Sequence, residues 1–598
     1  MSSSFFSHRW NLVAALVVLA VYVMVLSVLP TNVFWAPDEG GRFIELHALR
    51  WDHGVVYTLP YPGRRLDPQL QFYPGSGDPN ATYSVYPAPH PDGTLRFHWP
   101  IWFPLLSRAF LTAFGTTGLY VLPLLSGWLI ALVAGRLTWF FLPAWAPIAI
   151  LLVGFATPVC FYSQAFWEHT LATLLGTIAA LLLVGARPGR LSTLAGMGPA
   201  LLLAVVLRLE MLAFAVAVLL AWAVCAVVAH RHRAAVGPMT ESPPRALPLR
   251  LLAVVVAALA LALIAATALT PRHRGLLQSV PHRVSGHLAK VRHLPHGIIG
   301  LWINSPWNEG PWLDHRGEIA GLIALGLCLG ATFVTTVSVE AALIVPGLLL
   351  LLVVSVALAG STQQYRALHG VFPISPYLVI GLYALPQAWR RRDHRLLALA
   401  WLTSLYLLMG TGANFIVYAN ANGDLLNSLE WGPRYLLTLY PLLAVLSVVA
   451  LHQHYTSERP AALRLSVVAL IMMLVVVAGQ QEVRGLGMLS TNRHIFTRWE
   501  AQLRQEGPIV TDLWWLPTAV ADLFTTHEMY FVRERTQVRR WAALAAQQGV
   551  TRFTFASMEP VSADDFAAPA VRAATTGART VFGLHLTRFQ LAAVPDAQ

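Results

Sequence analysis

Residues 10–30 read WNLVAALVVLAVYVMVLSVLP, and residues 33–42 follow them as VFWAPDEGGR. The first stretch is apolar over about the 20 residues that a helix needs to cross a bilayer. The second stretch places two adjacent carboxylates, Asp38 and Glu39, beside Trp35 at the end of that helix. We therefore expect a spanning helix followed by an acidic pair at the membrane surface.

The composition of the whole chain indicates a membrane protein. Of its 598 residues, 56% are hydrophobic and 12% are charged, whereas a soluble domain carries about 25% charged residues. This deficit excludes a soluble enzyme, because the several domains of such a chain would lack a charged surface. The basic residues are scattered between apolar stretches, so nucleic-acid binding is not expected. The 3 cysteines lie in or beside apolar stretches, which argues against disulfides and CxxC metal sites.

Further apolar stretches predict about thirteen spanning helices in total. They lie near residues 10–30, 116–136, 139–157, 169–186, 193–207, 211–229, 251–270, 318–337, 340–359, 372–388, 396–412, 435–452 and 464–480. The arginines of the short connecting loops fall on one side of this layout, which places the N-terminus in the cytoplasm. An odd number of spans then places the C-terminus outside, in a multi-pass protein of the plasma (inner) membrane.

Three polar segments lie on the predicted outer face: a first outer loop at 31–115, a basic loop at 271–317 and a tail at 481–598. Strands and helices alternate in part of the tail, which predicts a small α/β domain. The strands are expected at 508–514, 528–532, 552–556 and 581–590, and the helices at 493–505 and 536–548. The predicted fold is thus an α-helical polytopic membrane domain, residues 1–480, with a small extracytoplasmic α/β domain, residues 481–598.

The first outer loop is expected to contain two helices that lie in the membrane interface. Residues 38–51 have apolar side chains at near-helical spacing, and a second aromatic stretch ends near Gly115. Asp38 and Glu39 begin the first of these helices. A carboxylate located where the dielectric falls can accept a proton near neutral pH and act as a general base. The alternative is that both acids merely cap the N-terminus of the helix.

Ionisable residues also lie within or beside the predicted spans, where they are costly and usually pair or function. Glu168 and His169 lie where the fourth span meets the outer face, and the alternative to a functional role is an interfacial pair in contact with headgroup water. Arg208 and Glu210 interrupt a long apolar stretch. They form either a structural ion pair or part of a polar pocket. Arg434 begins the twelfth span, where it either binds phosphate or extends its side chain toward the interface.

The basic loop at 271–317 contains 6 Arg or Lys residues and 6 His residues. One interpretation is a solvated face that meets anionic headgroups. The other is that some of these residues bind the phosphate of a carrier lipid. The His residues form no convincing pair at i and i+4, so a metal site is not expected there, although a requirement for a divalent cation stays open.

Several motifs, taken in chain order, resemble the GT-C glycosyltransferases, which are polytopic enzymes that take a sugar from a polyprenyl-phosphate carrier. The resemblance extends over about residues 10–450, and it lies in the order of the motifs rather than in any one of them. Protein O-mannosyltransferases, lipid A aminoarabinose transferases and mycobacterial arabinosyltransferases share this plan. The similar elements are the acidic pair 38–39, the segment 92–104, Ala156–Pro158, Tyr162–Ser163, Phe166–His169, Leu207–Glu210 with Leu209 in place of the usual Pro, Gly300–Leu301, Ser305–Pro306 and Gly432–Leu437.

The resemblance implies an inverting transfer of a hexose or pentose from polyprenyl phosphate to an acceptor hydroxyl of a cell-envelope glycan, lipid or protein on the outer face. Asp38 is expected to be the general base, with Glu39 beside it as a second catalytic residue. The phosphate leaving group needs positive charge more than a general acid. The residues expected to bind the donor or the acceptor are Arg42, Glu168, His169, Arg208, Glu210, Arg434 and Tyr435. No cofactor is expected apart from the donor itself.

Functions of other classes would give different patterns. A lipid-linked glycan flippase or another transporter usually shows repeated halves and broken helices at the midplane, and no internal repeat is evident in this sequence. A ligase or polymerase of the O-antigen type would have its main outer loop late in the chain. A sensor with a membrane anchor would not need thirteen or so spans.

Overall fold

The structure, a computed structural model, describes residues 5, 8–51, 55–75, 85–89, 95–96, 99–186, 191–236, 294–303, 316–334, 336–360, 370–391, 393–418, 429–566 and 571–593. The chain forms two compact units. The helical unit comprises Met1–Ser27, Leu122–Gln164 and Glu168–Met488. The mixed unit comprises Val28–Val121, Ala165–Trp167 and Leu489–Gln598.

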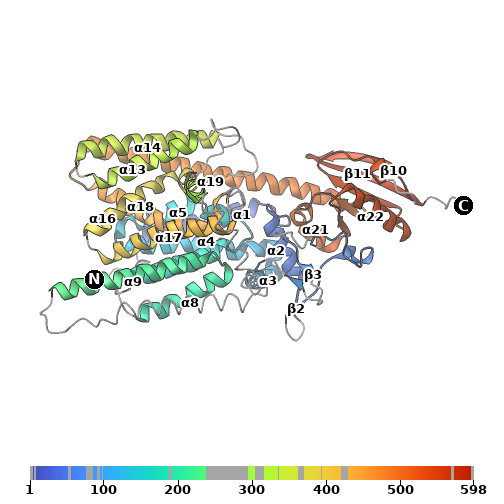
Figure 1. Cartoon of the computed structure of the whole chain (residues 1–598), viewed down its shortest axis with the longest axis horizontal. Coiled ribbons are helices and arrows are strands. Elements are labelled where there is room, and N and C mark those ends of the chain that lie inside the picture. Colours follow the sequence, from blue (N-terminus) through green and yellow to red (C-terminus); the bar gives the residue numbers. More distant parts are fainter. Residues whose placement is uncertain are drawn as a thin grey trace. The chain divides into compact units, whose positions relative to one another are not determined.

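The described part of the helical unit is built mainly from apolar helices (Figure 1). In chain order these helices are α1 (Arg9–Val28), α4 (Val121–Trp139), α5 (Ala146–Phe155), α6 (Val159–Tyr162), α7 (His169–Gly185), α8 (Leu191–Leu207), α9 (Met211–Val236), α12 (Leu294–Ile303), α13 (Arg316–Phe333), α14 (Val337–Gly360), α15 (Val371–Ile374), α16 (Val379–Arg391), α17 (His394–Tyr418), α18 (Leu439–Tyr455) and α19 (Ala461–Leu503).

The predicted polytopic membrane fold is confirmed, but the predicted count of spans is not. Within the described residues, 6 helices are long and apolar enough to cross a membrane, namely Arg9–Val28, Trp102–Trp139, Met211–Ala229, Val337–Ala357, His394–Phe415 and Ala461–Leu503. Other apolar helices, such as His169–Gly185, fall below 18 residues. The span expected at 251–270 lies outside the described residues.

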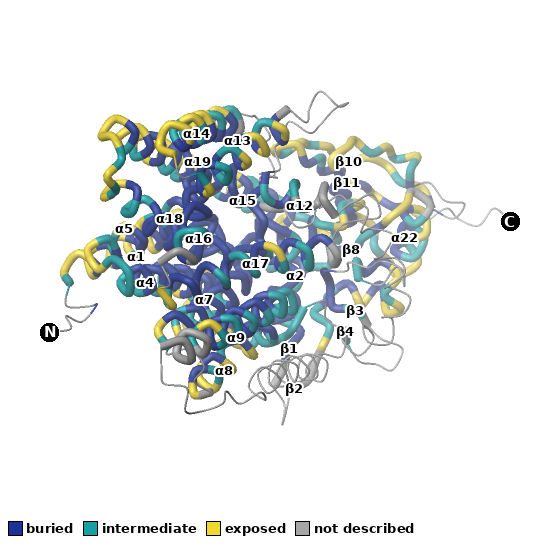
Figure 2. Tube along the Cα trace, turned by 60° about the vertical axis from the view of Figure 1, so that its left-hand side comes forward, coloured by how far each residue is buried: buried dark blue, intermediate teal, exposed yellow. Residues whose placement is uncertain are grey.

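The helices of the helical unit pack in neighbouring pairs. Helix α13 packs on α14, α9 on α17 and α16 on α18. Buried residues concentrate in α7, α16, α17 and α18, whereas α14 has many exposed positions (Figure 2). Large apolar side chains such as Leu16, Val353 and Met472 are exposed on the surface of the protein. Such a surface is stable only where it meets hydrocarbon, which agrees with a membrane-embedded bundle.

The C-terminal part of the mixed unit contains a five-stranded sheet in the order β10-β11-β9-β7-β8. Its strands are β7 (Ile509–Thr511), β8 (Met529–Phe531), β9 (Arg552–Ser557), β10 (Val571–Val581) and β11 (Leu584–Ala593). Strand β7 runs parallel to β8 and β9, while β10 and β11 form an antiparallel hairpin. The helices are α20 (Leu516–Ala519), α21 (Ala521–Thr526) and α22 (Arg535–Gln547). The predicted α/β domain is confirmed, with β10 as a strand that the sequence did not predict.

The first outer loop contains both expected helices, α2 (Pro37–Ala48) and α3 (Trp102–Phe114). The described residues of this loop also form four short strands, β1 (Leu49–Trp51), β2 (Val55–Tyr57), β3 (Ala88–Pro89) and β4 (Leu95–Arg96). A two-residue pair, β5 (Leu429–Glu430) and β6 (Gly432–Pro433), precedes α18 in the helical unit.

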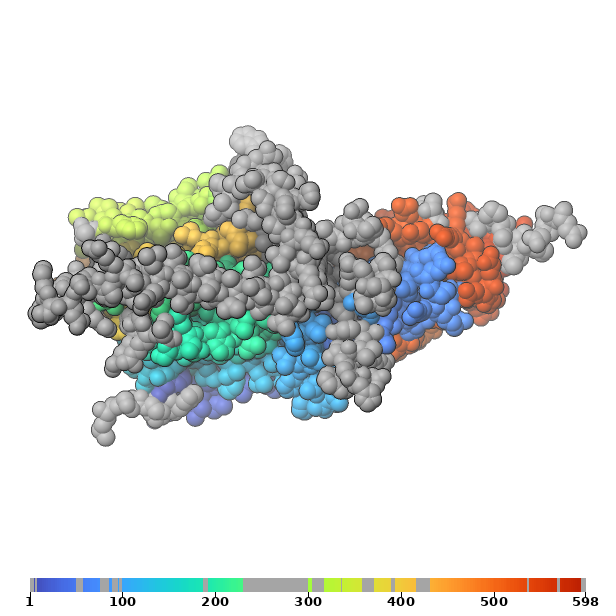
Figure 3. Space-filling model, turned by 60° about the horizontal axis from the view of Figure 1, so that its bottom comes forward, coloured from blue at the N-terminus to red at the C-terminus, as the bar shows by residue number. Residues whose placement is uncertain are grey.

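The first outer loop packs on the C-terminal sheet within the mixed unit, and Figure 3 shows residues of the loop in blue against the C-terminal segment in red. The backbone N–H of Phe531 donates to the carbonyl oxygen of Phe72 at 2.8 Å. Tyr61 stacks on Phe524, with ring centroids 6.0 Å apart. The compact units therefore divide the chain differently from the predicted domains 1–480 and 481–598, because apolar and hydrogen-bonding contacts join segments that are far apart in sequence.

Candidate functional site

The polar residues that interrupt the apolar stretches gather at helix ends in the helical unit. His169 is the first residue of α7, and Arg208 and Glu210 lie between the end of α8 and the start of α9. Arg434 begins a short 3₁₀ segment, Arg434–Leu436, which leads into α18. Because α7, α8 and α9 follow one another with short connections, the start of α7 and the α8–α9 junction lie at the same end of the bundle.

Arg208 forms the centre of this cluster. Its Nη1 donates to Glu168 Oε1 at 2.5 Å, and its Nη2 and Nε donate to the two carboxylate oxygens of Glu210 at 2.9 and 3.2 Å. Nη1 also lies 3.3 Å from Nε2 of His169. The Arg208 side chain is 10% exposed and that of Glu168 is 3% exposed. Arg208 and Glu210 therefore form both the ion pair and the pocket that the sequence left as alternatives.

Arg434 and Tyr435 form the opposite wall of the cluster. The guanidinium of Arg434 lies 4.9 Å from the centroid of the Tyr435 ring, and that of Arg208 lies 5.0 Å from the same ring. Nη2 of Arg434 donates to the Tyr435 hydroxyl at 2.9 Å. Arg434 is 7% exposed, so its side chain does not simply extend into the surroundings. Cation–π contact with two guanidiniums fixes the position of the aromatic ring.

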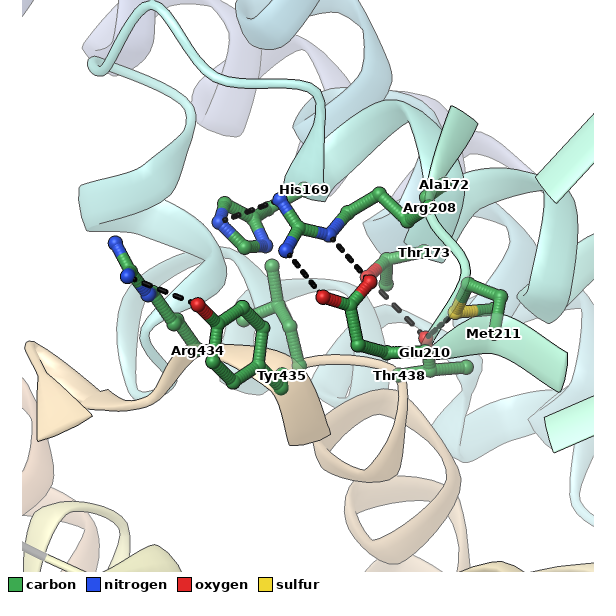
Figure 4. Close-up of a pocket in the computed structure, with 10 residues that line it drawn as sticks. His169, Ala172, Thr173, Arg208, Glu210, Met211, Arg434, Tyr435 and Thr438 are labelled. Atoms are coloured by element: carbon green, nitrogen blue, oxygen red, sulfur yellow. Dashed lines mark hydrogen bonds and ion pairs between the residues drawn. The ribbon is translucent and has the colours of Figure 1, made fainter. Parts of the chain in front are cut away.

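These side chains line a small pocket, shown in Figure 4. Helix α7 contributes His169, Ala172 and Thr173 to its wall. The other lining residues are Arg208, Glu210, Met211, Arg434, Tyr435, Leu437 and Thr438. The hydroxyl of Thr438 donates to that of Thr173 at 3.2 Å, which joins the start of α18 to α7. Thr173, Met211 and Thr438 are site residues that sequence reasoning missed, because single polar or apolar residues near a helix start carry no distinctive pattern.

The starts of three helices, α7, α9 and α18, face this pocket. Backbone N–H groups in the first turn of a helix have no partner within that helix, and the helix dipole places partial positive charge there. A phosphate or another anion is therefore stabilised at such ends. At these helix starts two arginines, Arg208 and Arg434, lie close to the carboxylates of Glu168 and Glu210, at a point that is otherwise surrounded by apolar helices.

The acidic pair of the first outer loop lies in the mixed unit, and its two members have different surroundings. Glu39 is fully buried, and its Oε2 accepts the backbone N–H groups of Trp35 and Ala36 at 2.7 and 3.3 Å. Its Oε1 accepts the N–H of Phe166 at 2.6 Å and Nη2 of Arg493 at 3.3 Å. This geometry favours the capping interpretation for Glu39, whose carboxylate binds the backbone and Arg493.

Asp38 is partly exposed at the start of α2. Its backbone carbonyl accepts Nη1 of Arg42 at 3.0 Å. Arg42 itself is buried, and its guanidinium lies 4.2 Å from the centroid of the Trp99 ring. The structure thus brings Arg42 against the first turn of α2.

Some predicted residues and motifs lie outside the described residues. They include nearly all of the basic loop 271–317, apart from Leu294–Ile303 and the beginning of α13, as well as Asp92, Gly93 and Ser305–Pro306. Among the residues that the structure describes, no group of three or more His, Cys, Asp or Glu side chains is arranged to hold a metal ion.

Comparison with known proteins returned matches only among solved structures. No protein-family model and no curated protein sequence matches this chain. ArnT from Cupriavidus metallidurans in the apo state matches with 13% identity and a TM-score of 0.45, over 96% of this chain and 97% of that one. The same protein bound to undecaprenyl phosphate matches with 12% identity and a TM-score of 0.43, over 96% of this chain and 97% of that one.

The archaeal oligosaccharyltransferase AglB from Archaeoglobus fulgidus, in complex with an inhibitory peptide and a dolichol-phosphate, also matches this chain. Its identity is 13% and its TM-score is 0.44, over 93% of this chain and 70% of that one. ArnT and AglB are both members of the GT-C superfamily, which is the family that the motif order resembles.

Proposed function

We propose that this protein is an integral-membrane glycosyltransferase that moves a sugar from a polyprenyl-phosphate carrier to an acceptor hydroxyl on the outer face of the membrane. The observation that carries the proposal is the pocket in which Arg208 and Arg434 meet the starts of three apolar helices. A substrate for such a place needs an anionic group for the arginines and an apolar body for the surrounding bundle. A polyprenyl phosphate has both.

The phosphate is proposed to bind near Arg434. A guanidinium offers several N–H donors in one plane to phosphate oxygens and is less costly to dehydrate than an ammonium group. Arg208 adds positive potential, but its charge is shared with Glu168 and Glu210. We therefore assign Arg434 as the principal phosphate ligand and Arg208 as the residue that organises the two carboxylates.

The sugar is proposed to contact the other lining residues. The carboxylate oxygens of Glu210 can accept hydrogen bonds from sugar hydroxyls, because its side chain is 18% exposed and lines the pocket. The hydroxyl of Tyr435, which accepts a hydrogen bond from Arg434, can also exchange hydrogen bonds with a sugar hydroxyl. His169 can accept or donate a hydrogen bond at its ring nitrogens. In this arrangement the arginine side of the pocket binds the phosphate, and the carboxylate side binds the sugar.

The proposed reaction is a single displacement with inversion at the anomeric carbon. Asp38 accepts the proton of the acceptor hydroxyl. At the same time, the oxygen of that hydroxyl forms the new bond to the anomeric carbon. The bond between that carbon and the phosphate oxygen breaks, and the electron pair leaves with the polyprenyl phosphate. Positive charge stabilises this leaving group as it develops, and a positioned base contributes about 10²–10⁴-fold to the rate.

The test is a transfer assay with the purified full-length protein. It is incubated with a panel of radiolabelled undecaprenyl-phosphate hexoses and pentoses and with a cell-envelope extract as the source of acceptor. We expect release of label from at least one donor, loss of transfer in Asp38→Asn and a raised donor KM in Arg434→Gln. Asp564→Asn and Arg539→Gln change exposed residues of the C-terminal domain in the same chemical way and should have no effect. Turnover of no donor in the panel, or full turnover by Asp38→Asn, would contradict the proposal.

A further inference from the structure

Two consecutive glycines follow the acidic pair inside α2, and both lie against backbone atoms. A Cβ atom at Gly40 would lie 1.9 Å from the carbonyl oxygen of Thr518 and 2.5 Å from its carbonyl carbon. A Cβ atom at Gly41 would lie 2.3 Å from the carbonyl oxygen of Val85. Glycine inside a helix is less favourable than alanine, so close approach of another chain segment gives a physical reason for this pair.

The backbone that approaches Gly40 belongs to the C-terminal part of the mixed unit. Thr518 lies in α20, whose four residues are all buried. The carbonyl oxygen of the next residue, Ala519, accepts the N–H of Phe34 at 3.0 Å, just before α2 begins. Trp515, which precedes α20, packs on Trp499 with ring centroids 5.9 Å apart. This segment therefore meets the start of α2 as a firmly packed backbone, not as a flexible side chain.

A second contact reaches the same turn of α2 from α19. Arg493 is fully buried, and its Nη2 donates to Oε1 of Glu39. Its guanidinium lies 4.5 Å from the centroid of the Tyr120 ring. Glu39 is the immediate neighbour of Asp38, and its carboxylate also binds the backbone at residues 35, 36 and 166. A buried ion pair with several further hydrogen bonds holds its partners in a defined geometry.

We infer that the C-terminal region positions Asp38, through the backbone of Thr518 against Gly40 and through Arg493 bound to Glu39. This inference rests on the proposed role of Asp38 as the base. Gly40, Glu39 and Arg493 are positioning residues, because their contacts are with the helix and not with the substrate. The C-terminal region thus contributes to the reaction through the position of Asp38.

The test uses Gly40→Ala in the full-length protein, assayed with the undecaprenyl-phosphate sugar that the wild-type protein turns over. The added methyl group favours the helical conformation but collides with Thr518, so α2 has to shift. Displacement of a reacting group by about 1 Å costs on the order of 100-fold in rate. We expect kcat to fall about 10- to 100-fold while the donor KM stays within about threefold of the wild-type value. Gly577→Ala is the matched control, because a Cβ atom there meets nothing within 4 Å.

Arg493→Lys provides a second variant in case Gly40→Ala does not fold. It keeps the positive charge but loses the planar contact with Tyr120, and we expect a fall of about tenfold in kcat at unchanged donor KM. Wild-type kcat in a folded Gly40→Ala or Arg493→Lys protein would overturn the inference, and so would a rise in KM at constant kcat. A wild-type protein that turns over no donor would instead refute the proposed function, so the two failures are distinguishable.

Discussion

The indole of Trp431 lies directly against the backbone of α19 at Gly485. A Cβ atom at Gly485 would lie 2.4 Å from the indole ring. Trp431 also stacks on Phe161, with ring centroids 5.5 Å apart and an interplanar angle of 24°. Gly432, the next residue, has a φ of +71°, which glycine adopts without strain. These contacts of Trp431 fix the chain three residues before Arg434. They therefore determine where the guanidinium of Arg434 enters the pocket.

Gly485→Ala is therefore expected to weaken donor binding. The added methyl group cannot fit beside the indole, so Trp431 and the segment that leads to Arg434 have to move. We expect the donor KM to rise by on the order of tenfold, with a smaller change in kcat. The measurement is steady-state kinetics with the donor identified in the transfer assay. Gly487→Ala on the same helix meets nothing within 4 Å and should behave as wild type; equal donor KM values in the two variants would contradict this account.

Removal of the Arg208 side chain is expected to destabilise the helical unit. Arg208→Met leaves the carboxylates of Glu168 and Glu210 in a largely buried place without their cation. Loss of one partner from a buried ion pair costs about 3–5 kcal/mol. The midpoint of thermal unfolding in detergent should therefore fall, and the double variant Arg208→Met/Glu168→Gln should recover part of the loss. An unchanged midpoint in Arg208→Met, with the exposed Arg539→Met as reference, would show that the pair contributes little.

The C-terminal sheet should lose stability in acid through Glu506. Burial raises the pKa of this carboxyl, but hydrogen bonds from Arg588 and Thr554 and the charges of Arg588 and Arg579 outweigh that effect, so the pKa lies below its ordinary value. A carboxyl with a lowered pKa in the folded state stabilises the fold above its ordinary pKa of 4.5. That contribution is lost as the pH falls through the folded-state pKa.

Hydrogen exchange of residues 552–593, corrected for the intrinsic rates, measures this loss at each pH. Protection should decrease below about pH 4.5 in the wild-type protein. Glu506→Gln should be less protected than wild type at neutral pH and should lack this part of the pH dependence. The interpretation fails if both proteins show the same dependence on pH.

Local patterns in the sequence predicted the local structure well. The acidic and apolar residues of 38–51 predicted α2, and the aromatic stretch that ends near Gly115 predicted α3. Residues 536–548 predicted α22 to within a residue at each end. In each segment the apolar side chains recur at helical spacing and so share one buried face. A short stretch of sequence therefore contains the information that determines the element.

Elements whose polar residues find partners inside the protein were predicted less well. The last span was expected to end near 480, where Gln481, Glu482 and Arg484 follow, but α19 continues to Leu503. Glu482 is buried within the helical unit, and an apolar window cannot show this. Strand β10 was missed because its centre, Ala573–Ala578, has few of the large β-branched or aromatic residues that indicate strands.

The site was predicted as a set of residues but not as an arrangement. Each member of the Arg208 cluster is conspicuous in the sequence because it is ionisable and interrupts an apolar stretch. The pairing of Arg208 with Glu168, 40 positions away, requires the tertiary fold. Arg493 gave no signal at all, since nothing near it in sequence indicates that it binds Glu39, 454 positions away.

Strand β10 forms one margin of the C-terminal sheet, next to β11. Its pairing shifts register between Thr575 and Gly577, and Arg572 is exposed near its start. A long, straight edge strand would offer its unpaired main-chain N–H and C=O groups to the same strand of another molecule. The register shift would interrupt a ladder of hydrogen bonds between two such strands. The positive charge of Arg572 would also repel the same residue of an identical strand. The domain can therefore present its longest strand to solvent and still resist sheet-to-sheet polymerisation, even when molecules are crowded in a membrane.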